Sequence, residues 1–381
     1  MIEDPAGGGA KLVSHRFVVL DIARSLASLW VLGAHFSILT GQPIFLLSQG
    51  RLPVEMFIFI SGFLMCEITR KSKDPRKLWE SFYIRRFFRI APSFFLAVCL
   101  YWCLGDYLSV AFSDMHEKSL GLSSPISPVT ANAGLGTLGL HFLFLHGIFP
   151  AHAGGIFGPA WSLSLEVQFY LIAPWIMAWQ RWRPITLLVA CAVINLIANR
   201  LFGTYGSDGL CWNYFYPSFL PNRIFLFLFG AIVCHAYHER GLRSWKLLVI
   251  SGVVVAGLFG AKTLVVTAPL AGAVLLWPWL SAVFPRITTA CERSKFVDIL
   301  AEYSYGIYLY HIMAIGVCWM GLRRSKWLTE GDGFSTAERL WLLLIVVAVT
   351  LAISGFIFHF LEKPFRRVGA RLANKLPDDR K

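Results

Sequence analysis

The apolar segment at residues 17–39 carries three ionisable side chains: Asp21, Arg24 and His35. Such residues are costly inside a membrane-spanning helix and are functional candidates for that reason. Arg24 and His35 are eleven residues apart, close to three helical turns, so a helix would place both on one face, about 16 Å apart along its axis. Asp21 can pair with Arg24 three residues later. We expect a functional face here; the alternative is a polar packing stripe with a hydrogen-bonded histidine.

A second acidic candidate, Glu166, lies in the apolar segment at residues 161–180. In the topology derived below, Glu166 and His35 both fall near the outer ends of their segments, so we expect them to meet at similar depth. A carboxylate beside an imidazole fixes its tautomer and raises its basicity. The alternative is a glutamate that reaches the membrane interface next to an anchoring tryptophan. The run WSLSLE, which Glu166 closes, adds three pocket candidates: Trp161, Ser162 and Ser164.

Three arginines stand in the run YIRRFFRIAP, ahead of the apolar segment expected at residues 92–110: Arg85, Arg86 and Arg89. Guanidinium groups form strong bidentate hydrogen bonds with phosphates. Together these arginines can hold an anionic, phosphate-bearing ligand that approaches from the cytoplasm. The alternative is that each only fixes the orientation of the chain in the membrane.

The segment at residues 297–320 contains a row of tyrosines followed by a histidine. On a helix, Tyr305 and Tyr308 share one face, and Ser304 shares a face with His311 seven residues later. This pattern indicates a water-lined cavity, with anchoring at the membrane interface as the alternative. Two further pocket candidates, in residues 53–69, are Glu55 and Ser61.

The eight cysteines are scattered along the chain, and most lie in apolar runs. We identify no Cys-x-x-Cys pair and no Cys/His spacing typical of a metal site. We therefore expect the cysteines to pack as small apolar side chains, and we expect no metal ion.

The composition indicates the elements that must position these residues. Of the 381 residues, 56% are hydrophobic and 15% are charged, whereas a soluble domain has about 25% charged residues. A spanning helix needs about 20 mostly apolar residues. We predict an all-α, polytopic transmembrane helical bundle of about ten spans. They are residues 17–39, 53–69, 92–110, 161–180, 185–202, 219–237, 246–261, 264–283, 297–320 and 339–361.

The net charge of +13 lies in short clusters between apolar runs, which argues against a nucleic-acid partner and for a cytoplasmic excess of positive charge. The basic cluster between residues 70 and 89 then places both termini in the cytoplasm, with tails at 1–16 and 368–381. The stretch 134–149 is apolar enough for an eleventh span, but a crossing there would put the later basic clusters outside. We therefore interpret 111–160 as an external excursion with a re-entrant or surface helix.

Six motifs, in this order, resemble those of the acyltransferase 3 family of integral membrane acyltransferases. The match covers about residues 16–367, although that family usually has Asp where this chain has Glu55. The motifs are Leu20-Asp21 through Arg24 to His35; Glu55-Met56-Phe57 with Ser61-Gly62-Phe63; Arg86 to Pro92; Trp161 to Glu166 with Phe169-Tyr170-Leu171 and Pro174; Tyr303 to His311; and Glu362-Lys363-Pro364.

The resemblance implies a membrane acyltransferase domain at residues 17–367 in a bacterial inner membrane. It implies transfer of an acyl group, most often acetyl from acetyl-CoA as co-substrate, with no permanently bound cofactor. The implied acceptor is a hydroxyl of a glycan or lipid-linked saccharide, such as an O-antigen, an exopolysaccharide or a lipo-oligosaccharide. A small molecule such as a macrolide is the alternative acceptor.

These implications agree with the residues themselves. The arginine cluster, with Arg24 deeper and Asp21 beside it, suits the phosphates of CoA. His35 would act as general base on the acceptor hydroxyl, and Glu166 would orient it or balance its charge. A proton-coupled transporter would also use ionisable residues within spans and is the competing class. A scaffold protein is third, and the oligomeric state is open.

Overall fold

The computed structural model describes residues 17–44, 47–71, 75–120, 128–198, 218–239, 241–259, 261–323 and 333–376. The predicted tail 1–16 and residues 199–217, which fall between the predicted spans 185–202 and 219–237, lie outside the described residues. Within the described parts, every regular element is a helix, and one isolated antiparallel bridge joins Val129 to Phe157. The all-α prediction is confirmed.

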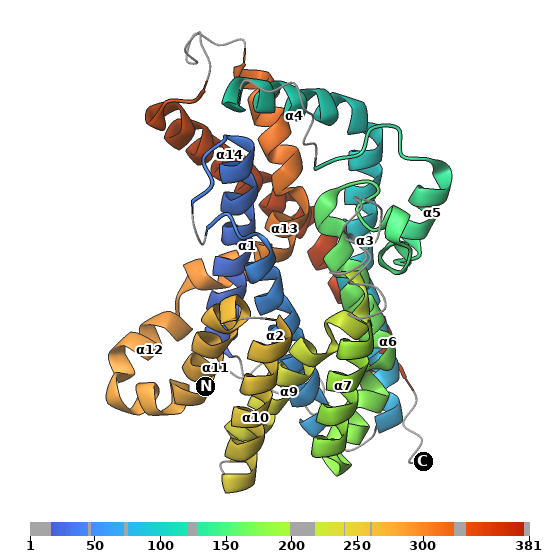
Figure 1. Cartoon of the computed structure of the whole chain (residues 1–381), viewed down its shortest axis with the longest axis vertical. Coiled ribbons are helices and arrows are strands. Elements are labelled where there is room, and N and C mark those ends of the chain that lie inside the picture. The colour runs from blue at the N-terminus through green and yellow to red at the C-terminus, as the bar shows by residue number, and fades with distance from the viewer. Residues whose placement is uncertain are drawn as a thin grey trace.

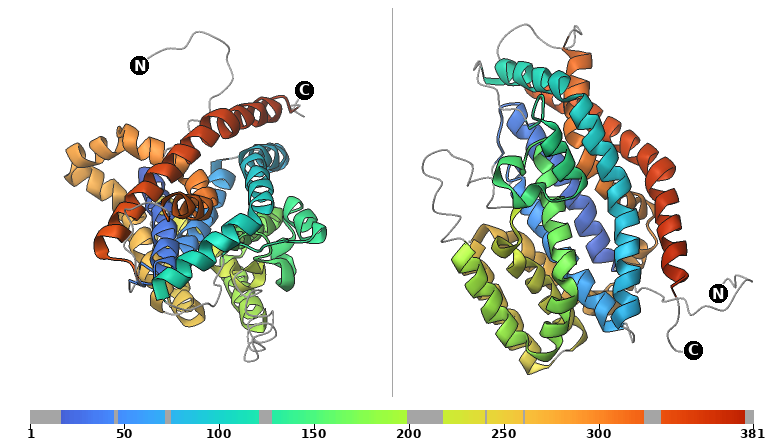
Figure 2. Two further views of the ribbon diagram at one scale, coloured as in Figure 1. Left: turned by 90° about the horizontal axis from the view of Figure 1, so that it is seen from above. Right: turned by 90° about the vertical axis from the view of Figure 1, so that its right-hand side faces the viewer.

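Figure 1 shows the helices as an elongated bundle with α1, α2 and α13 at its centre. The π-helical stretch Phe358–Glu362 joins α14 to α15, and Figure 2 shows the three as one curved run alongside α3. The helices are α1 (Val18–Leu39), α2 (Arg51–Lys71), α3 (Pro75–Cys103), α4 (Gly105–Leu120), α5 (Leu135–Phe142), α6 (Trp161–Trp182), α7 (Pro184–Ala198), α9 (Ile224–His238), α10 (Leu242–Phe259), α11 (Ala261–Val283), α12 (Pro285–Glu292), α13 (Lys295–Leu322), α14 (Thr336–Ile357) and α15 (Lys363–Asn374).

Six described helices are long and apolar enough to cross a membrane, and two shorter apolar helices lie beside them. The protein is therefore a multi-pass membrane protein by helix length and composition. The count of ten spans and the cytoplasmic termini stay predictions. The six long candidates are 18–39, 51–70, 77–103, 262–283, 295–322 and 336–374, and the shorter two are 185–197 and 224–238.

The third predicted span, 92–110, has the wrong bounds. α3 begins at Pro75 and continues through Pro92, and a turn at Leu104 separates it from α4. Membrane helices tolerate an interior proline. On either side of Pro92, α13 bonds to the backbone of α3: Tyr305 donates a hydrogen bond to the carbonyl of Ile90 at 2.9 Å, and Tyr310 donates one to that of Ser93 at 2.8 Å. The arginines of YIRRFFRIAP therefore lie within a helix long and apolar enough to span the membrane, and not ahead of one.

The stretch 134–149 does not form a span. Its helix, α5, has eight residues and is about 12 Å long, far below the ~30 Å of a hydrocarbon core. Ser164 of α6 fixes the following turn, because its hydroxyl donates to the carbonyl of Phe144 at 2.6 Å and accepts from the amide of Gly147 at 3.1 Å. This agrees with the rejection of an eleventh span, while the external location of 111–160 stays a prediction.

α2 and α9 pack with their backbones in contact. A Cβ atom at Gly62 would overlap the carbonyl of Phe227, and one at Gly230 would overlap that of Phe59. Small residues at such crossings let membrane helices approach closely. The crossing fixes the position of α9 relative to α2, and α2 in turn contributes a wall to the cavity described next.

Candidate functional site

A cavity lies where α1, α2, α3, α6 and α13 meet. Arg24, Arg86 and Arg89 bring three guanidinium groups to its wall, and Glu166 brings one carboxylate. Three positive charges against one negative charge leave the wall positively charged, as an anionic ligand requires. The other lining residues are Val54, Phe57, Ile58, Ile60, Ser61, Leu64, Ile90, Ser162, Leu163, Phe227, Ser304, Tyr305 and Tyr308.

Glu166 is held in place by two hydroxyl groups. Ser61 of α2 donates a hydrogen bond to Glu166 Oε1 at 2.9 Å, and the Tyr170 hydroxyl donates to the same oxygen. Arg86 lies over the Tyr170 ring, 5.1 Å from its centroid, a distance at which a cation and an aromatic face attract. Tyr170 thus contacts both the Glu166 carboxylate and the Arg86 guanidinium.

Two of the three predicted arginines on α3 line the cavity, and the third does not. Arg85 is exposed and donates a hydrogen bond to Asn374 of α15 at 2.7 Å. The grouping of Arg85 with Arg86 and Arg89 is therefore corrected. Helical spacing leaves Arg85 at the edge of the shared face, where α15 provides a partner.

The tyrosines of α13 border the cavity as the sequence indicates. Tyr308 donates a hydrogen bond to the carbonyl of Pro159 at 2.8 Å, and its hydroxyl lies 2.6 Å from the hydroxyl of Ser162. Tyr305 lines the same wall and bonds to α3. These hydrogen bonds tie α13 to α3 and to the start of α6.

His35 pairs with His311 of α13. His311 Nδ1 lies 2.8 Å from the carbonyl of Tyr308, and its Nε2 lies 3.2 Å from His35 Nδ1. His35 Nδ1 also lies 2.9 Å from the carbonyl of Val31. In a neutral pair, both Nδ1 atoms must carry the proton, because each faces a carbonyl oxygen that can only accept. This assignment leaves His35 Nε2 with a lone pair, the feature that a general base needs.

The predicted pairing of His35 with Glu166 is wrong. Glu166 accepts from Ser61 and Tyr170, whereas His35 contacts His311. Neither histidine is among the residues that line the cavity, and Tyr308, whose ring centroid is 6.2 Å from that of His311, stands between the two regions. His35 and Glu166 lie on the helices that the sequence predicts. The rotation of these helices directs the two side chains toward different neighbours.

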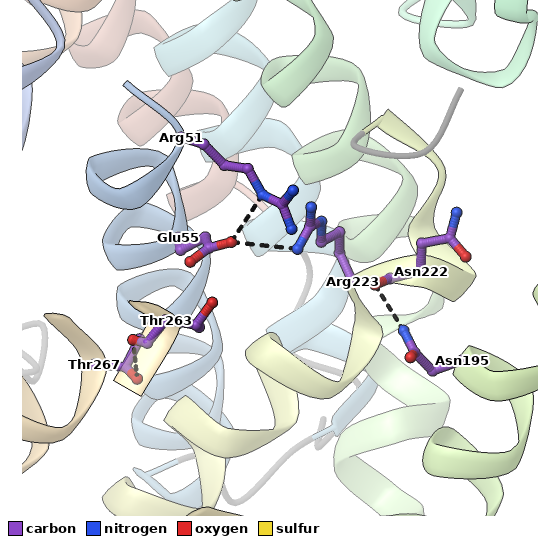
Figure 3. A network of polar contacts seen from close by, with 7 residues as sticks. All are labelled: Arg51, Glu55, Asn195, Asn222, Arg223, Thr263 and Thr267. Carbon is purple, nitrogen blue, oxygen red and sulfur yellow. Dashed lines mark hydrogen bonds and ion pairs between the residues drawn. The ribbon is translucent and has the colours of Figure 1, made fainter. Parts of the chain in front are cut away.

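Glu55 belongs to a separate ion-pair cluster. Its Oε1 lies 3.1 Å from Arg51 Nε and 3.3 Å from Arg223 Nη1, and Figure 3 shows both arginines directed at this one oxygen. Glu55 and Arg223 are both 1% exposed. Breaking such a buried pair is strongly destabilising. Glu55 is thus outside the cavity lining, and the cluster connects α2 to α9.

Of the remaining predicted site residues, some line the cavity and others lie outside its lining. Ser61 and Ser162 line the cavity, whereas Ser164 is buried beneath the turn at Phe144. Trp161 begins α6 outside the lining, and Asp21 lies in the first turn of α1, where its charge acts on Arg24.

Sequence reasoning gave no role to Tyr170 or Arg223. Tyr170 stands four residues after Glu166, on the same helical face, and this spacing was a usable signal. Arg223 stands within the apolar segment 219–237, where a charge is itself a functional signal.

The sequence model of the acyltransferase domain family matches residues 17–359. This chain belongs to the acyltransferase 3 family. It is therefore a membrane acyltransferase, as the ordered motifs predict.

Three curated relatives differ in how much they share with the chain. The peptidoglycan O-acetyltransferase OatA of Listeria monocytogenes is 23% identical over 92% of this chain and 56% of its own length. A putative acetyltransferase, ORF330 of Acidianus two-tailed virus, is 24% identical over 76% of this chain and 81% of its own length. The regulator of hypoxia-inducible factor 1 of Caenorhabditis elegans is 28% identical over 42% of this chain and 34% of its own length. No solved structure is significantly similar to the chain.

Proposed function

We propose that the protein moves an acetyl group from cytoplasmic acetyl-CoA to a hydroxyl of an exported or cell-surface glycan, in a bacterial inner membrane. The observation that carries the proposal is the arginine-lined cavity, which shares α1 and α13 with a neutral histidine pair. OatA, to which the chain is similar over most of its length, is named as a peptidoglycan O-acetyltransferase. The similarity to OatA supports O-acetyl transfer as the reaction type. It does not identify the acceptor of this chain.

The donor binds through its phosphates. Arg24, Arg86 and Arg89 approach one cavity from two helices, and guanidinium–phosphate hydrogen bonds are strong. Glu166 balances part of this charge and, with Tyr170, holds Arg86 in place. This role replaces the predicted support of His35.

With its phosphates at the arginines, CoA must extend along α1 to bring its thioester to His35. Arg24 and His35 are about 16 Å apart along the helix axis, similar to the length of the pantetheine arm of CoA. Tyr308 and Ser162 line the cavity with their hydroxyl groups 2.6 Å apart, and the Tyr308 ring centroid is 6.2 Å from that of His311. The thioester carbonyl would reach His35 past this hydroxyl pair.

His35 Nε2 accepts the proton of the acceptor hydroxyl as the hydroxyl oxygen attacks the thioester carbonyl. The C–S bond breaks, and the CoA thiolate takes the proton back from the imidazolium. The ester and CoA thiol are the products, so atoms and charge balance. His311 Nε2 accepts from His35 Nδ1–H, which orients the base and stabilises the charge that it gains.

The test is acceptor-dependent release of CoA thiol by the purified full chain in lipid nanodiscs with acetyl-CoA. We expect release with a glycan acceptor and incorporation of acetyl on that glycan by mass spectrometry. Mass spectrometry of surface glycans from a deletion strain would identify the acceptor. If no acceptor causes CoA release and the protein conducts protons without acetyl-CoA, the acyltransferase proposal is wrong and a transporter is favoured.

A further inference from the structure

Beyond the glycine crossing, α2 and α9 bring together three side chains of different chemistry. Glu67 of α2 and Cys234 and His238 of α9 offer ligand atoms that all lie within 4.8 Å of one another. His238 Nε2 is 2.6 Å from Glu67 Oε2, and Cys234 Sγ is 3.7 Å from the same oxygen. The thiol of Cys66, the residue before Glu67, interacts with that of Cys234. Cys66 lies outside the three-residue group and would reach a shared ion by a change of side-chain rotamer.

This donor set favours one kind of ion. Mg²⁺ and Ca²⁺ prefer oxygen ligands alone, whereas Zn²⁺ takes sulfur, nitrogen and carboxylate oxygen in tetrahedral sites. Glu67 is 5% exposed and Cys234 is fully buried, so a carboxylate and a thiolate here need a compensating charge. His238 is half-buried at the end of α9 and leaves a path for entry.

The charges balance around a divalent ion. Two thiolates and one carboxylate carry three negative charges, and Zn²⁺ supplies two positive ones. Arg70, with Nε 3.9 Å from Glu67 Oε2, supplies the third. The alternative is an ion-pair cluster of Arg70, Glu67 and His238 with two neutral thiols, and the two states differ in metal content and in the protonation of the cysteines.

We propose that Glu67, Cys234 and His238 bind one Zn²⁺ ion, with the Cys66 thiolate as fourth ligand. Binding releases the thiol protons. The ion joins α2 to α9 about one turn from Leu64 and about two turns from Phe227, both of which line the cavity, so it braces one wall of that cavity. The expectation of no metal site rests on local motifs, whereas these ligands come from two helices that are far apart in the chain.

The test measures zinc per chain in the full protein purified without chelators, by inductively coupled plasma mass spectrometry. We expect about one zinc per chain, as in other closed four-ligand sites. Cys234→Ala and His238→Ala should each lower it about tenfold or more. His235→Ala is the matched control, because His235 lies on the same helix and pairs with Glu239 instead; it should keep its zinc.

A second readout does not depend on the folding of variants. The wild-type chain, stripped of metal and titrated with Co²⁺, should show a thiolate-to-cobalt charge-transfer band and tetrahedral absorption bands at one ion per chain. Absence of this band and of zinc overturns the proposal. So does a Cys66–Cys234 disulfide in the freshly purified protein, detected by mass spectrometry without reductant.

Discussion

The cavity and the histidine pair share two helices, α1 and α13, but the two regions differ in charge. The cavity gathers ionisable side chains, with Arg24, Arg86 and Arg89 facing Glu166. His35 and His311 share one hydrogen bond and need no charge to form it. Permanent charge suits the binding of a polyanion, whereas a neutral imidazole with a lone pair suits proton transfer. The two regions should therefore fail in different ways when they are mutated.

The largest expected effect is at His35. A positioned general base contributes about 10²- to 10⁴-fold to rate, so His35→Ala should lower kcat by that factor while the Kd for acetyl-CoA stays near normal. The measurements are CoA release and donor binding by calorimetry. His359→Ala is the control, because His359 is an exposed histidine on the π-helical stretch. Near-normal turnover by His35→Ala would remove the base from the mechanism.

The next effect separates binding from chemistry. A hydrogen bond to a charged group contributes about 1.5–3 kcal/mol, so Arg24→Ala or Arg89→Ala should raise the donor KM about 10- to 100-fold. Arg85→Ala is the matched control, because this arginine of the same helix is exposed and bonds to Asn374. If Arg85→Ala weakens donor binding as much as Arg89→Ala, the cavity arginines have no special role.

A double-mutant cycle sharpens the comparison between the regions. Residues in contact show coupling of about 0.5–3 kcal/mol, whereas independent sites add. His311→Ala should therefore cost much less in the His35→Ala background than alone. Glu166→Gln should cost the same in both backgrounds, because Glu166 bonds to Ser61 and Tyr170 and not to His35. Strong coupling of His35 to Glu166 would restore the pairing that the structure rejects.

The sequence predicts depth along a helix better than it predicts neighbours. Arg24 and His35 occupy one helix at the expected separation because the helical repeat alone fixes it. The partner of His35 depends on how α1 and α13 rotate against each other, and packing decides that rotation. The ion-pair partner of Glu55 could not be predicted for the same reason, because Arg223 is 168 residues away in the sequence.

The smallest expected effect comes from a second histidine pair, which is not among the residues that line the cavity. His141 on α5 and His146 in the next turn stack with ring centroids 3.9 Å apart. Burial lowers the pKa of His141 to about 3, with His146 adding to the shift, and burial lowers the pKa of His146 to about 4. Each is thus neutral in the folded state at pH values where the unfolded chain, with a pKa near 6.5, takes up a proton.

The sign of the pH dependence follows from linkage. Where the unfolded chain binds more protons, stability rises with pH. The contribution of the pair is therefore complete above about pH 6.5, falls as the pH drops toward 4, and levels off near 3. The melting temperature of the protein in nanodiscs should decrease over this window, with acetyl-CoA absent.

Matched variants isolate the pair. His141 uses Nδ1 toward the carbonyl of Thr137 at 2.8 Å, and His146 uses Nε2 toward that of Ala160 at 3.0 Å. Asparagine and glutamine carry an amide nitrogen near these respective positions, so His141→Asn with His146→Gln keeps the donors and removes the titration. The double variant should show a flatter decrease in melting temperature between pH 6.5 and 4, whereas His359→Ala should keep the wild-type slope. Equal slopes in all three proteins would mean that other groups cause the acid sensitivity, because two neutral amides cannot reproduce the titration of a buried imidazole pair.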